Sequence, residues 1–118
     1  MVSGSAAATA AVIRMLEQGG NAADAGSAAL LALSVTKVGA FCIGGEVPVL
    51  VYDAGAKDVK VLSGQGAAPL DPKAIDWYMK NGIPSSDVLS AAVPAALDVI
   101  VTPARSVGEG LALAAGEW

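Results

Sequence analysis

The 118-residue sequence has no histidine and only one cysteine, Cys42. Without histidine, the chain cannot hold a Ser-His-Asp or Cys-His catalytic set, because both use an imidazole as the general base. Zinc sites lose a common nitrogen ligand for the same reason, and one cysteine allows no internal disulfide. We therefore expect no catalytic residue, metal or cofactor in this chain, and we expect Cys42 to be a small buried apolar residue.

Charged and aromatic residues are also scarce. Seven basic and 11 acidic residues give a formal net charge of −4, and the basic residues are scattered along the chain. Proteins that bind nucleic acid or anionic membranes instead concentrate basic residues on one surface. Aromatics make up only 4% of a chain that is 54% hydrophobic. We expect no nucleic acid or membrane partner, and we expect apolar surface that packs against further protein.

No segment is typical of a signal peptide or a membrane-spanning helix. The first 20 residues lack a positively charged start, and Arg14 and Glu17 interrupt their apolar stretch. The nearly uncharged run over 25–35 is much shorter than the roughly 20 residues that cross a bilayer. We expect a soluble protein of the cytoplasm or periplasm, with residues 1–118 forming a single segment because this length fits one domain.

The first third of the sequence predicts two helices. Ser3 or Ser5 can cap the first helix, and a pair of glycines ends it. Asn21 is a favourable N-cap for the second helix, and Asp24 is placed three residues later to interact with the exposed backbone N–H groups. This second helix extends to about Val35 and has apolar residues nearly all round, so we expect it to be central and buried.

After residue 38 the pattern becomes typical of β-strands. Residues 47–53 are rich in β-branched side chains, and the residues that point to either side of this strand are apolar. A turn over 54–57 leads to a second run of this kind over 58–64. The pattern predicts a β-hairpin that is covered on both faces.

Two more elements are predicted further along the chain. Asp71 and Pro72 suit the N-cap and first position of a short helix that extends to Met79. Residues 88–93 favour another strand, and Pro94 can begin a final helix that extends to Ile100 or Val101. We find no internal repeat and no linker typical of disorder.

Residues 19–25, with the sequence GGNAADA, resemble the GGNAxDA signature near the start of the large subunit of the γ-glutamyltransferase family. Four further motifs follow in the family's order: IGG at 43–45, LVYD at 50–53, GxxxAP at 64–69 and Val-Pro at 93–94. Five ordered motifs form a specific match, whereas one glycine pair would not. The alternative is an unrelated α/β domain in which these residues only cap helices and form turns.

The resemblance implies an α+β chain that is part of an αββα four-layer N-terminal nucleophile hydrolase, with helices packed on a central antiparallel hairpin. In this family a precursor cleaves itself to free a threonine, whose hydroxyl attacks an amide with its own α-amino group as the base. Thr9, Thr36 and Thr102 do not correspond to that threonine. The resemblance therefore implies an incomplete N-terminal portion of an amide-cleaving or acyl-transferring enzyme.

The partners implied are the remainder of the large subunit, the small subunit that carries the threonine nucleophile, and a small-molecule amide substrate. A different hypothesis is a non-catalytic assembly or binding module derived from the same scaffold. An unrelated small-molecule binder that uses the Gly44-Gly45 turn is a third hypothesis, although the glycine spacing of nucleotide-binding loops is absent from that segment.

Two candidate substrate-binding residues depart from the family pattern. Gln65 stands where the family's GRETAP segment has an arginine that holds the substrate's α-carboxylate. A guanidinium forms two charge-assisted bonds to a carboxylate, and losing them costs about 2–3 kcal/mol. Glu46 stands where the family commonly has glycine, and a carboxylate there would favour an amine or cation. Alternatively, Gln65 is a turn residue and Glu46 is a solvated or paired charge.

Overall fold

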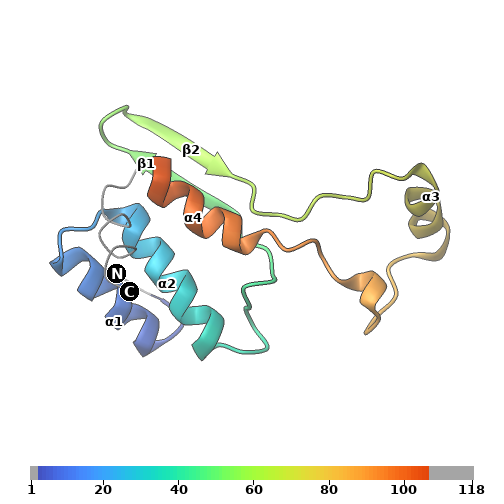
Figure 1. Cartoon of the computed structure of the whole chain (residues 1–118), viewed down its shortest axis with the longest axis horizontal. Coiled ribbons are helices and arrows are strands. Elements are labelled where there is room, and N and C mark those ends of the chain that lie inside the picture. The colour runs from blue at the N-terminus through green and yellow to red at the C-terminus, as the bar shows by residue number, and fades with distance from the viewer. Residues whose placement is uncertain (1–2, 107–118) are drawn as a thin grey trace.

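The computed structural model describes residues 3–106, which form helices and one two-stranded antiparallel sheet. The elements in chain order are α1 (Ala6–Glu17), α2 (Ala22–Thr36), β1 (Val49–Asp53), β2 (Asp58–Leu62), α3 (Pro72–Asn81), the 3-10 helix η1 (Val88–Ser90) and α4 (Ala96–Ser106). Figure 1 shows a body made of α1, α2, α4 and the hairpin, and an arm that carries α3 and η1 away from it. The predicted α+β class, with helices packed on an antiparallel hairpin, is confirmed.

The joint between α1 and α2 has the caps that the sequence predicts. Ser5 is the N-cap of α1, and Gly19 takes a φ of 90° just after its end, a conformation that glycine adopts without strain. The Asn21 side chain accepts hydrogen bonds from the backbone N–H groups of Ala23 and Asp24, at 2.8 and 3.1 Å. Asp24 in turn accepts one from the Asn21 N–H at 2.9 Å. This reciprocal capping box starts α2 sharply.

The buried core lies around α2, which packs against both α1 and α4. Its apolar members are mostly small: Ala8, Val12, Ala23, Ala25, Ala96, Val99 and Ile100. The buried Ser27 hydroxyl donates a hydrogen bond across it to the Ile100 carbonyl, at 2.7 Å. Small residues let the helices approach closely, so the core needs no aromatic ring.

The second half of α2 is less covered than we expect from its sequence. Its fully buried residues all lie within 23–27, whereas Leu31 and Val35 are exposed. The prediction of a helix buried all round is therefore wrong for the described chain. An apolar helix surface indicates that other residues pack on it, but it does not indicate which part of a protein supplies those residues.

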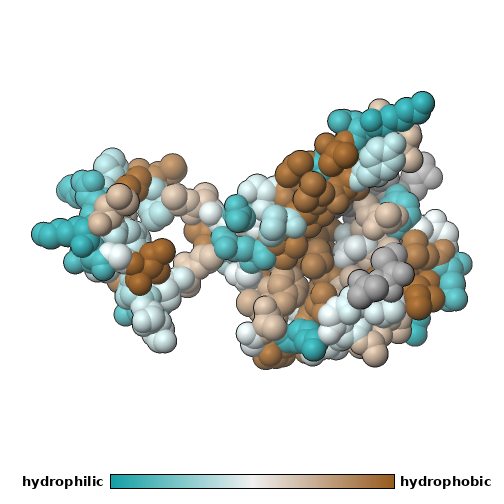
Figure 2. All heavy atoms as spheres, turned by 180° about the vertical axis from the view of Figure 1, so that it is seen from behind, coloured by the Kyte–Doolittle hydropathy of each residue, from teal (hydrophilic) through white to brown (hydrophobic). Residues whose placement is uncertain are grey.

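The hairpin is also covered on only one face. Leu50 pairs with Val61, and Tyr52 pairs with Val59, so these four apolar side chains share one side of the sheet. Leu50 is 72% and Val61 70% exposed. Figure 2, seen from behind, shows a broad band of apolar surface across the body of the molecule. The prediction that both faces of the hairpin are covered is wrong for residues 3–106.

The turn of the hairpin is held by Asp53. Its Oδ1 accepts hydrogen bonds from the backbone N–H groups of Gly55 and Ala56, at 3.0 and 3.1 Å, and its Oδ2 lies 3.1 Å from Lys60 Nζ. The Ala56 N–H, followed by the Lys60 side chain, lowers the pKa of Asp53 below its ordinary value. The carboxylate therefore stays ionised and keeps its acceptors available to the turn.

Beyond the hairpin, the predicted strand is wrong and the bounds of the last helix differ from the prediction. Residues 88–93 do not form a strand, because Val88–Ser90 is a 3-10 helix and no described strand pairs with this segment. The final helix is confirmed, but it begins at Ala96 rather than at Pro94 and extends past Val101. The short helix after Asp71 is confirmed, with Asp71 as its N-cap and Gly82 just after its end.

Replacing Asn21 by alanine should lower the free energy of unfolding by about 1 kcal/mol, because two N–H groups at the start of α2 lose their side-chain acceptor. Urea unfolding followed by circular dichroism measures the change. Gln18→Ala is the control, since Gln18 is an exposed residue at the end of α1. Equal effects of the two substitutions would contradict the capping role of Asn21.

Candidate functional site

Three of the motifs singled out in the sequence meet where the arm leaves the body. The Val47 N–H donates to the Gly64 carbonyl at 2.8 Å, and the N–H groups of Ala95 and Ala96 donate to the Gly45 carbonyl at 3.3 and 3.0 Å. The glycine-rich segment therefore binds the chain entering the arm and the chain leaving it. We call this place the neck junction and define it as residues 45–47, 64–66 and 93–96.

The backbones at the neck junction approach so closely that two positions require glycine. A Cβ atom at Gly64 would overlap the Val47 carbonyl oxygen and lie 2.6 Å from a methyl group of Val99. Gly64 also has a φ of 50°, which side chains disfavour. A Cβ atom at Gly66 would overlap the Val93 carbonyl oxygen. Gly64 of the GxxxAP motif, and Gly66 two residues later, therefore have a packing reason at this place.

The structure places Glu46 at the centre of the neck junction. Its Oε1 accepts a hydrogen bond from the Gly66 N–H at 2.8 Å, and the residue is exposed. This bond bridges the glycine-rich segment and the GxxxAP segment. Within the described chain, Glu46 takes part in no salt bridge, so its charge has no cationic side chain as partner there.

Gln65 lies at the same junction, between two anchored neighbours. The carbonyl of Gly64 binds the Val47 N–H, and the N–H of Gly66 binds Glu46. Gln65 itself is exposed. The structure thus brings the two predicted substrate-binding residues together, and it fixes the backbone on both sides of Gln65. Their contact with a substrate stays a prediction.

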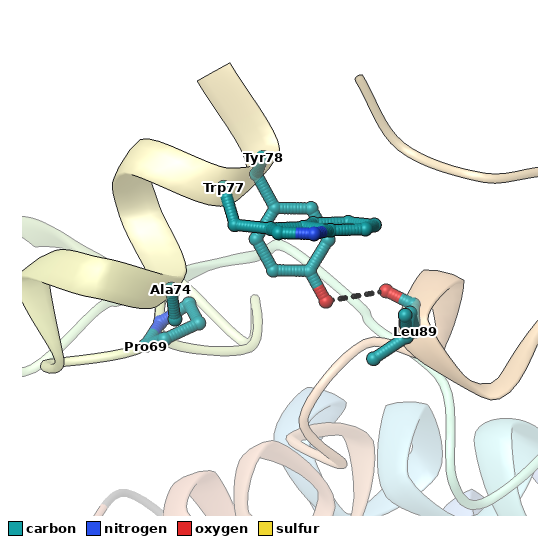
Figure 3. A pocket seen from close by; sticks show the side chains of 5 residues that line it. All are labelled: Pro69, Ala74, Trp77, Tyr78 and Leu89. Carbon is teal, nitrogen blue, oxygen red and sulfur yellow. Dashed lines mark hydrogen bonds between the residues drawn. The ribbon is translucent and has the colours of Figure 1, made fainter. Parts of the chain in front are cut away.

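The arm has a hollow that we did not predict from the sequence, beside two adjacent aromatic residues. Tyr78 donates a hydrogen bond from its hydroxyl to the Leu89 carbonyl at 2.7 Å, which ties α3 to η1 (Figure 3). Trp77 lies edge-on to the Tyr78 ring, with 5.2 Å between the ring centroids. A hollow of about 410 Å³ adjoins these residues. The adjacent aromatic residues, in a chain with few aromatics, were the signal for it.

A second groove lies between the arm and the neck junction. Its volume is about 520 Å³, and it shares Pro69, Tyr78 and Leu89 with the hollow in Figure 3. Glu46 and Gly66 contribute to its lining. Part of the groove is therefore formed by the predicted site and part by the arm.

Other candidate chemistry in the chain is limited. Cys42 is a free and exposed thiol, so the expectation that it is buried is wrong. The hydroxyls of Thr9 and Thr36 donate to carbonyls one helical turn earlier, at 3.2 and 2.8 Å. Among residues 3–106 there is no group of three potential metal ligands, and no helix there is long and apolar enough to span a bilayer.

Comparison with known proteins gives a consistent result. The model of the gamma-glutamyltranspeptidase family matches residues 8–115. A solved structure described as that of LmbA2991T421A is 33% identical with a TM-score of 0.69, and one described as that of LmbA2991HD is 32% identical with a TM-score of 0.67. Each alignment covers 87% of this chain and 18% of the other chain. This chain therefore spans less than a fifth of either structure. No curated protein matches it.

Replacing Gly66 by alanine should disrupt the neck junction, because the new methyl group would displace Val93 from its position. We expect a loss of about 1–3 kcal/mol in the free energy of unfolding, typical of overpacking, together with faster proteolysis of the arm. Gly44→Ala is the matched control, since a Cβ atom there meets nothing within 4 Å. If both variants unfold and digest alike, the close approach at Gly66 does not constrain the arm.

Proposed function

Since the chain belongs to the gamma-glutamyltranspeptidase family, whose model matches residues 8–115, we propose that it is the N-terminal segment of an amidohydrolase or acyltransferase. The reaction is the cleavage of γ-glutamyl or related amide bonds, with transfer of the acyl group to water or an amine. In this proposal residues 1–118 form one segment of a larger catalytic unit.

The nucleophile of this reaction is a threonine outside the chain. Its hydroxyl oxygen attacks the amide carbon, and its own α-amino group takes the proton. Backbone or side-chain donors stabilise the oxyanion of the tetrahedral intermediate. The carbon–nitrogen bond then breaks, the amine leaves with a proton, and the acyl-enzyme passes its acyl group to water or a second amine. The chain described here supplies scaffold and part of the pocket.

The partners in this proposal are the rest of the large subunit and the small subunit that carries the threonine. The exposed apolar face of the hairpin supports it, because Leu50, Tyr52, Val59 and Val61 form a patch that isolated proteins rarely leave open. The exposed residues on α2 support it as well. A second sheet that packs on this face of the hairpin would complete the four-layer arrangement.

The observation that carries the proposal is the neck junction. Three family motifs, which are far apart in the sequence, meet there through bonds of Gly45, Gly64 and Gly66, and Gln65 lies between the last two. The position that holds a substrate carboxylate in the family therefore has a fixed backbone in this chain. Its side chain is a neutral amide, which forms only ordinary hydrogen bonds to a carboxylate. We infer a substrate that lacks the α-carboxylate of a γ-glutamyl group, or one whose carboxylate is bound elsewhere.

The test uses the full-length gene product. Intact mass should show self-cleavage into two chains, the smaller of which begins with threonine. Turnover of a γ-glutamyl anilide should be low, and Gln65→Arg should raise its kcat/KM roughly 30- to 200-fold, the equivalent of about 2–3 kcal/mol. Gln18→Arg makes the same charge change at the end of α1 and should leave turnover unchanged.

Two other results of these experiments would contradict parts of the proposal. Turnover comparable to that of a relative with the arginine would contradict the changed substrate class. A gene product that neither cleaves itself nor carries a downstream threonine would contradict the enzyme and favour the non-catalytic assembly or binding module.

A further inference from the structure

The groove between the arm and the neck junction combines apolar walls with a single charged group. Among the described residues that line the groove, Glu46 is the only aspartate, glutamate, lysine or arginine. The apolar walls include Pro69, Ile75, Tyr78, Met79, Leu89 and Val93. Its volume of about 520 Å³ lies in the range of small-molecule sites. A site with this lining discriminates between ligands mainly through the charge at one end.

Glu46 is held in place without losing its ability to bind a ligand. Its Oε1 accepts the Gly66 N–H at 2.8 Å, which orients the carboxylate relative to the groove. Its Oε2 makes no hydrogen bond within the described chain, and the residue is exposed. A carboxylate oriented by one oxygen and open at the other presents an acceptor for a cation.

The walls of the groove present few polar groups that could compete with Glu46 for a ligand. The Tyr78 hydroxyl proton is used in the bond to the Leu89 carbonyl, so that donor is already occupied. The lysines of α3 border a different hollow, together with Asp76 and Asn81. No lysine or arginine among the described residues lines the groove. The charge of Glu46 is therefore not neutralised by a basic residue of the lining.

We propose that this groove is a binding site for an organic cation, with a primary ammonium group on Glu46 and an apolar body against the arm. An anion would be repelled by the carboxylate, and a neutral molecule would gain only the burial of its apolar part. The site goes beyond the proposed function, because binding here requires neither a threonine nucleophile nor an acyl-enzyme.

The probe is 2-phenylethylammonium, and 2-phenylethanol serves as its neutral counterpart of similar size. Both are titrated into the full-length gene product by saturation-transfer difference NMR. We expect the ammonium to bind about three- to tenfold more tightly, the range of an accessible charge-assisted contact. Raising the ionic strength from about 0.01 to 1 M should reduce this preference, because salt screens the exposed charge.

Glu46→Gln is the decisive variant, because the amide oxygen can still accept the Gly66 N–H while the charge is removed. It should bring the affinity for the ammonium down to that for the alcohol and leave the alcohol unchanged. Glu17→Gln removes an exposed carboxylate at the end of α1 and should keep the preference. Ile83→Ser, at an exposed wall position, should weaken both ligands alike.

Equal affinities for the two ligands in the unmodified protein would overturn the proposal, and so would a preference that survives Glu46→Gln. If that variant does not fold, the salt dependence of the unmodified protein decides, and a preference that salt does not reduce overturns the proposal. A protein that never cleaves itself but prefers the ammonium would contradict the proposed function alone. Self-cleavage without the preference would contradict this inference alone.

Discussion

The close approach of Val47 to Gly64 is the constraint on which the arrangement of body and arm depends. The hydrogen bond between their backbones is 2.8 Å long, and a side chain at Gly64 would overlap the Val47 carbonyl. Because glycine has no side chain, the segment before β1 can lie directly beside the segment that enters the arm. In the same segment before β1, the Gly45 carbonyl accepts hydrogen bonds from the residues at the start of α4. The contact at Gly64 therefore places the hairpin and the arm, and the Gly45 carbonyl adds the last helix.

Local elements were predictable from the sequence because the residues that determine them are neighbours. The capping box of Asn21 and Asp24 and the N-cap Asp71 each need only a few adjacent residues. For the candidate site, the family motifs named Glu46 and Gln65, whose contact with a substrate stays a prediction. The bond from Gly66 to Glu46 joins residues 20 positions apart, and no local pattern indicates it. The motifs named these residues but not their proximity.

The wrong predictions have a common cause. Whether an apolar face is buried, and whether a strand is paired, depends on residues that are distant in the sequence. Residues 88–93 have the composition of a strand, but no described strand lies beside them. The last helix starts at Ala96, and the N–H groups of Ala95 and Ala96, which have no acceptor within the helix, bind the distant Gly45 carbonyl. Likewise, the apolar faces of α2 and of the hairpin were correctly identified as apolar but wrongly assigned as buried.

The two glycines that flank Gln65 also have an evolutionary consequence. Their packing fixes the backbone on each side, so a change of side chain at position 65 leaves the course of the chain unaltered. Each glutamine codon differs from one arginine codon by a single nucleotide. A lineage can therefore gain or lose a charged group at this position in one mutational step without rebuilding the fold around it. Under the proposed role of Gln65, substrate preference can then diverge while the scaffold is inherited intact.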